Sequence, residues 1–115
     1  DFDVFKSVSP FFAMTSHVIY KSIDPKNTAT HSSYLINNIV RKNIGFKGIL
    51  ITDDISMKAL KFSLIENGFK ALEAGCNLAL HCNGKLSEII KLAKYIPQVD
   101  DFTQKKTSQF YKFLG

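Results

Sequence analysis

Three short apolar segments, each ending in polar residues, constrain the fold of this chain more than any other feature of its sequence. They are FFAMTSHV (Phe11–Val18), GILITDD (Gly48–Asp54) and NLALHCN (Asn77–Asn83). Each is almost continuously apolar before it turns polar, which is typical of a parallel strand buried on both faces, whereas a half-exposed antiparallel strand would alternate. We therefore predict parallel strands, side by side in sequence order, at Phe11–Thr15, Gly48–Thr52 and Asn77–His81.

The segments between and after these strands carry apolar residues at helical spacing. The predicted stripes are Leu35, Ile36, Ile39, Val40 and Ile44 before Gly45; Leu64, Ile65, Phe69 and Leu72 before Gly75; and Leu86, Ile89, Ile90, Leu92 and Ala93 before Pro97. Thr30, Ser32 and Ser33 are alternative N-caps for the first of these helices. We expect residues 1–8 to end an earlier helix, and Asp100–Gly115 to form the last one.

The strands and helices alternate, with about 30 residues between successive strands, as in a βαβ unit. Such alternation predicts an α/β fold in which helices cover a parallel sheet. A closed (β/α)₈ barrel needs about 250 residues, and this chain has 115. The sequence is therefore either a small open α/β domain or the last part of a larger one.

The composition and charge exclude several classes of protein. The net charge is +5, but the basic residues are scattered and Arg41 is the only arginine, so we expect no nucleic-acid partner. No apolar run approaches the roughly 20 residues that span a bilayer, and no signal peptide is visible. Because the chain starts with Asp1 rather than Met, we expect it to be a fragment. Cys76 and Cys82 are expected to be reduced and buried.

The two aspartates that end the second apolar segment are the candidate site. Alternation along a strand places Ile49, Ile51 and Asp53 on one face, and puts Asp54 on the face toward the helices. Asp54 or Ser56 is then suited to cap a helix in the segment MKALKF. Asp53 has no such role, because a carboxylate in line with apolar residues is costly unless something uses it.

Three motifs carry a resemblance that covers residues 2 to 97: MTSHVIY, NIGFKGILITDDISMKAL and ALEAGCNLALHCNG. They resemble the C-terminal part of the catalytic domain of family 3 glycoside hydrolases, in the bacterial β-N-acetylhexosaminidase branch. The resemblance implies that residues 1–115 are part of a TIM barrel, its strands six to eight. It also implies that Asp53 is the nucleophile of a retaining hydrolysis that removes terminal N-acetylglucosamine from peptidoglycan-derived muropeptides or glycosides. A cytoplasmic enzyme of peptidoglycan recycling, without a cofactor, is the expectation.

The same resemblance implies that important parts of the enzyme are missing. The family's general acid/base histidine and its principal sugar-binding residues precede the matched motifs, so we expect no general acid/base here and no activity from the chain alone. His17 and Met57 are candidate substrate-binding residues, although a hydrogen-bonded rim residue and simple packing remain the alternatives. We expect no metal, although zinc held by His17, His81, Cys82 and Asn83 is conceivable. Asn77 stands where relatives often carry Asp, and we expect little to depend on it.

The competing interpretation is a protein that is not an enzyme by itself. It would be an inactive remnant, or a structural subunit that needs a partner chain to supply the rest of the barrel. Both interpretations require the same residues at the ends of the strands, so the sequence leaves them open.

Overall fold

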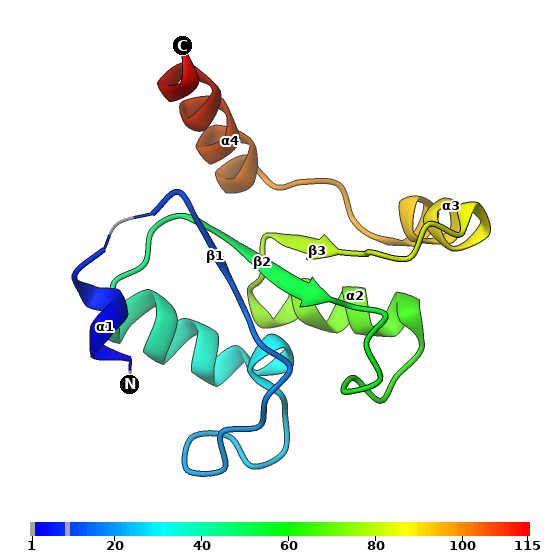
Figure 1. The fold of residues 1–115 in the computed structure, drawn as a ribbon, viewed down its shortest axis with the longest axis horizontal. Coiled ribbons are helices and arrows are strands. Elements are labelled where there is room, and N and C mark those ends of the chain that lie inside the picture. Colours follow the sequence, from blue (N-terminus) through cyan, green and yellow to red (C-terminus); the bar gives the residue numbers. More distant parts are fainter. Residues whose placement is uncertain (1, 9) are drawn as a thin grey trace.

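A computed structural model describes residues 2–8 and 10–115 and contains one three-stranded parallel sheet (Figure 1). Its strands are β1 (Phe12–Met14), β2 (Ile49–Asp54) and β3 (Leu78–Leu80), in the order β1-β2-β3. β1 pairs with β2 in parallel, with Phe12 opposite Ile49, and β2 pairs with β3 in parallel. The predicted strand order and direction are confirmed, although β1 and β3 are shorter than predicted and β2 runs two residues further.

Helices lie before, between and after these strands, in the three segments with helical periodicity and elsewhere. They are α1 (Asp3–Lys6), a short 3₁₀ helix η1 (Ala29–His31), η2 (Leu35–Asn43), α2 (Leu64–Ala74), α3 (Leu86–Tyr95) and α4 (Asp101–Leu114). α1 lies within the expected N-terminal helical segment, whose residue Asp1 is outside the described part. Ser63 and Asp100 cap α2 and α4 with side-chain oxygens that accept the backbone N–H groups of Glu66 and Thr103.

Helix η2 differs from an ordinary α-helix. It is wound as a π-helix, so that the N–H of Ile44 reaches the carbonyl of Ile39, five residues back, over 2.8 Å. The turn that leads into it is capped by Ser32, whose Oγ accepts the N–H of Leu35 over 3.1 Å. Of the three candidate caps, Ser32 therefore holds this position.

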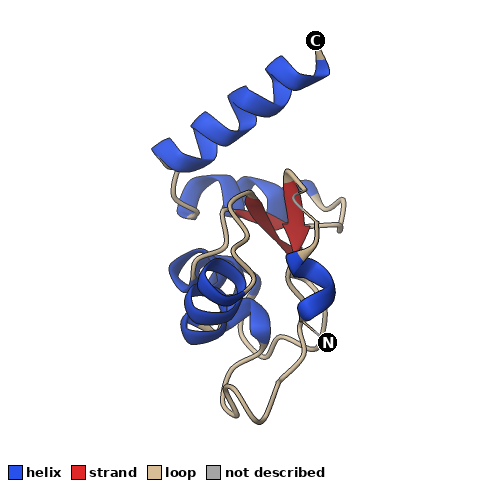
Figure 2. Cartoon of the chain, turned by 90° about the vertical axis from the view of Figure 1, so that its left-hand side faces the viewer, coloured by secondary structure: helices blue, strands red, loops and turns tan. Residues whose placement is uncertain are grey.

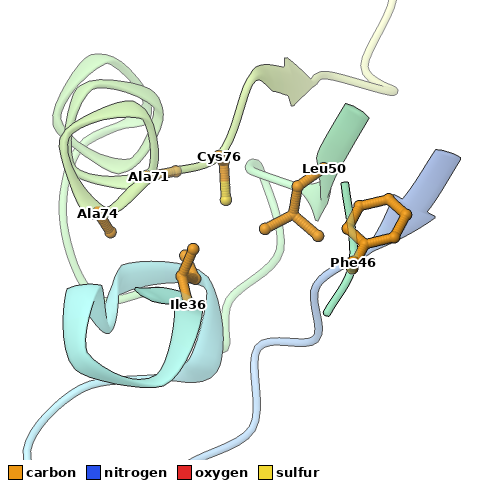
Figure 3. Packing of buried hydrophobic residues seen from close by; sticks show 6 residues of the cluster. All are labelled: Ile36, Phe46, Leu50, Ala71, Ala74 and Cys76. Atoms are coloured by element: carbon orange, nitrogen blue, oxygen red, sulfur yellow. The ribbon is translucent and has the colours of Figure 1, made fainter. Parts of the chain in front are cut away.

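The buried core lies between the sheet and two helices (Figure 3). Leu50 of β2 packs with Ile36 of η2 and with Ala71 and Ala74 of α2, and the core also contains Phe46 and Cys76. Gly75 ends α2 with φ of 122°, and a Cβ there would lie 2.8 Å from Cγ2 of Ile36. Both the backbone conformation and this close approach explain a glycine at the end of the predicted stripe.

On the opposite side of the sheet, α4 covers the starts of the strands. Phe110 of α4 lies edge-on against Phe12 with ring centroids 4.8 Å apart, and it also contacts Phe11 at 5.3 Å. Figure 1 shows the strands between α4 above and η2 and α2 below, and Figure 2 shows the same separation after a quarter turn. The other end of the sheet, where the strands finish, stays clear of α4.

Two further findings concern exposure. Cys76 is buried but Cys82 is exposed, so the expectation that both thiols are buried is wrong for Cys82. None of the helices in residues 2–8 and 10–115 combines the length and the hydropathy that crossing a membrane requires.

Candidate active site

Asp53 and Asp54 are the last two residues of β2 and lie at the end of the sheet that α4 leaves clear. The Asp53 side chain is half-buried, and its Oδ1 accepts the backbone N–H of Asp54 over 2.8 Å. No other group in residues 2–8 and 10–115 donates a hydrogen bond to this carboxylate. Because a carboxylate has about four acceptor positions, most of its capacity to bind a ligand or to attack one remains available.

Asp54 has a different environment, because its carboxylate is used by its neighbours. Its Oδ1 accepts the N–H of Ser56 at 3.0 Å and that of Cys82 at 3.2 Å, and the Ser56 hydroxyl donates to Oδ1 or Oδ2 at 2.8 and 2.7 Å. Burial raises the pKa of Asp54, but these hydrogen bonds and the charge of His81 outweigh it and hold the pKa below its usual value. Asp54 is therefore a structural carboxylate that joins the end of β2 to the segment after β3.

The helix that Asp54 or Ser56 was expected to cap does not form. The segment MKALKF is a series of turns, in which Met57 N–H bonds to Asp54 O at 3.2 Å and Leu60 N–H bonds to Met57 O at 3.1 Å. An aspartate that binds the backbone two residues further on offers the chain a turn in place of a helix. In this chain the turns form instead of the helix.

His17 lies beside this turn, and both of its ring nitrogens are hydrogen-bonded. Nε2 lies 2.8 Å from the backbone carbonyl oxygen of Asp54, and Nδ1 lies 2.8 Å from Oγ1 of Thr30. Sequence analysis predicted only a possible capping role for Thr30, because no local pattern reveals a contact across 13 positions. The structure thus places His17 next to the candidate nucleophile, and its expected contact with substrate stays a prediction.

Met57 is also at this end of the sheet, and its side chain is 43% exposed. Packing of Met57 against α2, the helix that follows β2, stays an alternative prediction. A contact between Met57 and substrate remains a prediction that rests on the resemblance.

His81 lies between two carboxylates on the other side of Asp54. Its side chain is 8% exposed, with Nδ1 4.0 Å from Asp54 Oδ1 and Nε2 3.2 Å from Glu88 Oε2. Since Glu88 belongs to α3, His81 connects α3, which also contacts α2, to the end of β2. In the part of the chain that the structure describes, no three His, Cys, Asp or Glu side chains are grouped to hold a metal ion. The zinc alternative therefore gains no support.

Comparison with known proteins assigns this chain to a family. The family model for the glycosyl hydrolase family 3 N-terminal domain matches residues 10–109. A beta-hexosaminidase from Shewanella frigidimarina is 42% identical over 72 residues, which are 61% of this chain and 21% of the relative. One from Psychromonas ingrahamii is 34% identical over 100 residues, which are 85% of this chain and 27% of the relative.

Solved structures give the same result. The β-N-acetylglucosaminidase from Thermotoga maritima matches with a TM-score of 0.69 and 30% identity, over 98% of this chain and 27% of that one. The matches thus cover only 21% to 27% of the length of these three proteins. With a family model that covers residues 10–109, the chain belongs to glycosyl hydrolase family 3 and corresponds to part of the family's N-terminal domain.

Proposed function

We propose that this chain carries the nucleophile of a retaining β-N-acetylhexosaminidase, and that the nucleophile is Asp53. One observation carries the proposal: the Asp53 carboxylate stands at the C-terminal end of a parallel strand, and within the described residues 2–8 and 10–115 a single backbone N–H orients it. Active sites of parallel α/β folds lie at this end of the strands. The names of the relatives, beta-hexosaminidase and β-N-acetylglucosaminidase, support this substrate class.

In the proposed reaction an Asp53 oxygen attacks the anomeric carbon of a terminal N-acetylglucosamine residue. The bond from that carbon to the leaving-group oxygen breaks, a general acid protonates this oxygen, and the sugar becomes an ester of Asp53. Water, deprotonated by the same group acting as a base, then hydrolyses the ester, so that the configuration is retained.

The general acid is proposed to lie outside these 115 residues. Both ring nitrogens of His17 are hydrogen-bonded, to Thr30 and Asp54, and Nε2 of His31 bonds to the carbonyl of Asn67 at 3.0 Å. The ring nitrogens of His81 are buried beside the carboxylates of Asp54 and Glu88. A general acid is worth about 10²–10⁴-fold in rate. We therefore expect no measurable turnover by the chain alone.

We further propose that β1, β2 and β3 are strands six to eight of a TIM barrel. Their parallel order and the position of η2 and α2 on one face support this assignment. The face that bears Ile49 and Asp53 would then line the barrel, with α4 at the end away from Asp53. A cytoplasmic role in peptidoglycan recycling, on muropeptide-derived glycosides, is the corresponding biological proposal.

A second candidate is a structural subunit, or a remnant without activity, that requires a partner chain. Both candidates account for the exposed apolar surface of β1 and the loop after it, where Met14 is 57% and Val18 is 49% exposed. A partner that supplies the remaining barrel strands would cover this surface. The two candidates differ only in whether the assembled complex reacts at Asp53.

The deciding experiment combines this chain with the barrel portion that precedes the matched segment in the Psychromonas ingrahamii relative. Turnover of an aryl N-acetylglucosaminide is measured, and a 5-fluoro-N-acetylglucosaminyl fluoride is used to trap the ester for peptide mass spectrometry. We expect turnover and a label on Asp53, both lost in Asp53→Asn. The matched control Asp54→Asn should keep the label while it lowers stability. A complex that forms but shows neither turnover nor label would favour the structural subunit.

A further inference from the structure

A chain of hydrogen bonds runs beneath the candidate nucleophile from β1 to the end of β2. Thr15 Oγ1 lies 2.8 Å from Thr30 Oγ1, Thr30 Oγ1 lies 2.8 Å from His17 Nδ1, and His17 Nε2 lies 2.8 Å from the carbonyl oxygen of Asp54. Thr15 and Thr30 are buried, with Thr30 fully so. Buried hydroxyls of this kind need partners, and here the partners form a continuous path that ends on Asp54.

The donor at the Asp54 end of this path is fixed by chemistry. A backbone carbonyl can only accept a hydrogen bond, so Nε2 of His17 carries a proton and donates the hydrogen bond to the carbonyl oxygen of Asp54. The single hydroxyl proton of Thr30 has two neighbouring acceptors, the carbonyl oxygen of Ser16 at 3.1 Å and, in the neutral ring, Nδ1 of His17. With both ring nitrogens of His17 in contact with this path, neither is left free for a substrate.

Asp54 connects the path to the proposed nucleophile. Its carbonyl accepts from His17, while its N–H donates to Oδ1 of Asp53 over 2.8 Å. The two groups flank the same Cα atom, so a displacement of that atom when the His17 bond is lost also moves the N–H that Asp53 accepts. The carbonyl of Asp54, which also accepts the N–H of Met57 over 3.2 Å, thus links His17 to the residue whose N–H orients the Asp53 carboxylate.

We propose that His17 is a positioning residue for Asp53, and that it acts through the backbone of Asp54 rather than by binding the sugar. Its effect on catalysis rests on the proposed nucleophilic role of Asp53, while its effect on Asp54 does not. Misplacing a reacting group by about 1 Å can cost about 10²-fold in rate. Loss of the His17 bond is therefore expected to slow the chemical step and to leave substrate binding largely unchanged.

The kinetic test compares His17→Leu with His17→Gln in the complex described above. The Gln side chain keeps one N–H donor and one acceptor, whereas Leu keeps neither. We expect His17→Leu to lower kcat by about 10–10²-fold with KM within about twofold, and His17→Gln to restore most of the loss. Rates are expressed per active site, counted by the covalent label, so that a variant that merely folds less well shows no change in kcat.

Thr30→Val provides a second variant if His17→Leu does not fold. It has the shape of threonine but removes the hydroxyl that holds Nδ1, and we expect a smaller fall in kcat at unchanged KM. A rise in KM with kcat preserved, in either variant, would overturn the proposal and would support the direct contact between His17 and the sugar.

A second readout is independent of turnover. NMR spectra of the labelled chain in the same complex report the Asp54 amide and the Asp53 carboxyl carbon. We expect both signals to move in His17→Leu and to stay in place in His17→Gln. If they stay in place in folded His17→Leu, the positioning role is wrong. If they move although no complex turns over substrate, the proposed function fails while the role of His17 in orienting Asp53 stands.

Discussion

The guanidinium of Arg41 and the side-chain amide of Asn77, 36 positions apart, are joined by a hydrogen bond of 2.8 Å from Nη2 to Oδ1. The same Asn77 oxygen accepts the N–H of Leu50 at 2.7 Å. The other terminal nitrogen of Arg41 donates to the carbonyls of Phe46 at 3.1 Å and Gly48 at 2.8 Å. This pair therefore joins η2 to the starts of β2 and β3, at the end of the sheet opposite Asp53.

The first prediction follows from the charge of Arg41. Burial lowers its pKa, and none of the carboxylates in residues 2–8 and 10–115 lies within ion-pair distance of it. Asn77→Asp would supply one, in place of a neutral acceptor. Because Arg41 is already charged, the substitution turns a hydrogen bond to a neutral amide into one between two ionised groups, which is the stronger kind. We therefore expect a gain of about 1 kcal/mol, or roughly 4 °C in Tm.

Asn77→Ala is the matched control, and it should destabilise by about 1–3 kcal/mol because it leaves Arg41 and Leu50 N–H without their acceptor. Thermal unfolding followed by circular dichroism at one protein concentration measures both variants. A lowered Tm in Asn77→Asp, together with an unchanged Tm in Asn77→Ala, would mean that the contact between Arg41 and Asn77 contributes nothing to stability. The expectation that little depends on Asn77 would then be correct after all.

Periodicity predicted the strands and helices because it records which residues are buried. The parallel order, the stripes of η2 and α2 and the cap at Gly75 all follow from the spacing of apolar residues and from glycine. The same reasoning placed Asp53 at the end of β2. Its limit is visible in MKALKF, where a helix capped by Asp54 or Ser56 was expected and the local hydrogen bonds of Asp54 form turns instead.

Contacts between distant polar residues could not be predicted. Such contacts depend on how the helices and strands pack, and polar side chains carry no periodic signal that identifies their partners. The examples are Arg41 with Asn77, His17 with Thr30 and His81 with Glu88. The role of His17 is an example. Its position after the first strand was evident, but the carbonyl that it holds lies 37 positions away.

The second prediction concerns the two thiols. Burial raises the pKa of Cys76 to about 12, whereas Cys82 is exposed. Because the thiolate is the reactive form, we expect one cysteine per chain to react with iodoacetamide at pH 8, and the second only in denaturant. Mass spectrometry counts the adducts, and Cys82→Ser should abolish the fast reaction. Rapid labelling of Cys76 in the native chain would show that the core around it opens.

The third prediction concerns acid. Hydrogen bonds from the side chains of Ser32 and Asn27, and from the N–H groups of Lys26 and Asn27, lower the pKa of Asp24 from 3.8 to about 2. A lowered pKa in the folded state stabilises the chain above pH 3.8, and this stabilisation is lost as the pH falls toward 2. We expect Asp24→Asn to be less stable than the wild type at pH 5.

That difference should shrink between pH 4 and pH 2, because the wild-type carboxyl becomes protonated and then resembles the amide. Urea unfolding midpoints, measured for both chains at several pH values, test this convergence. A difference that stays constant down to pH 2 would indicate that the carboxylate of Asp24 does not hold the segment before η2.

The fourth prediction concerns association of the chain with itself. β1 and β3 are both edges of the sheet, and an unpaired edge beside exposed apolar side chains favours pairing with another chain. Met14 of the edge strand β1, which lies opposite Ile51 of β2, is 57% exposed. We therefore expect the isolated chain to form oligomers or aggregates in light scattering, and Met14→Lys to reduce them.

Leu114→Lys is the matched control, because it adds the same charge at the exposed end of α4, away from the sheet. Addition of the preceding barrel portion should suppress association as well, since it would cover the same edge. A monodisperse monomer that melts cooperatively would contradict the proposal that this sheet is part of a larger barrel.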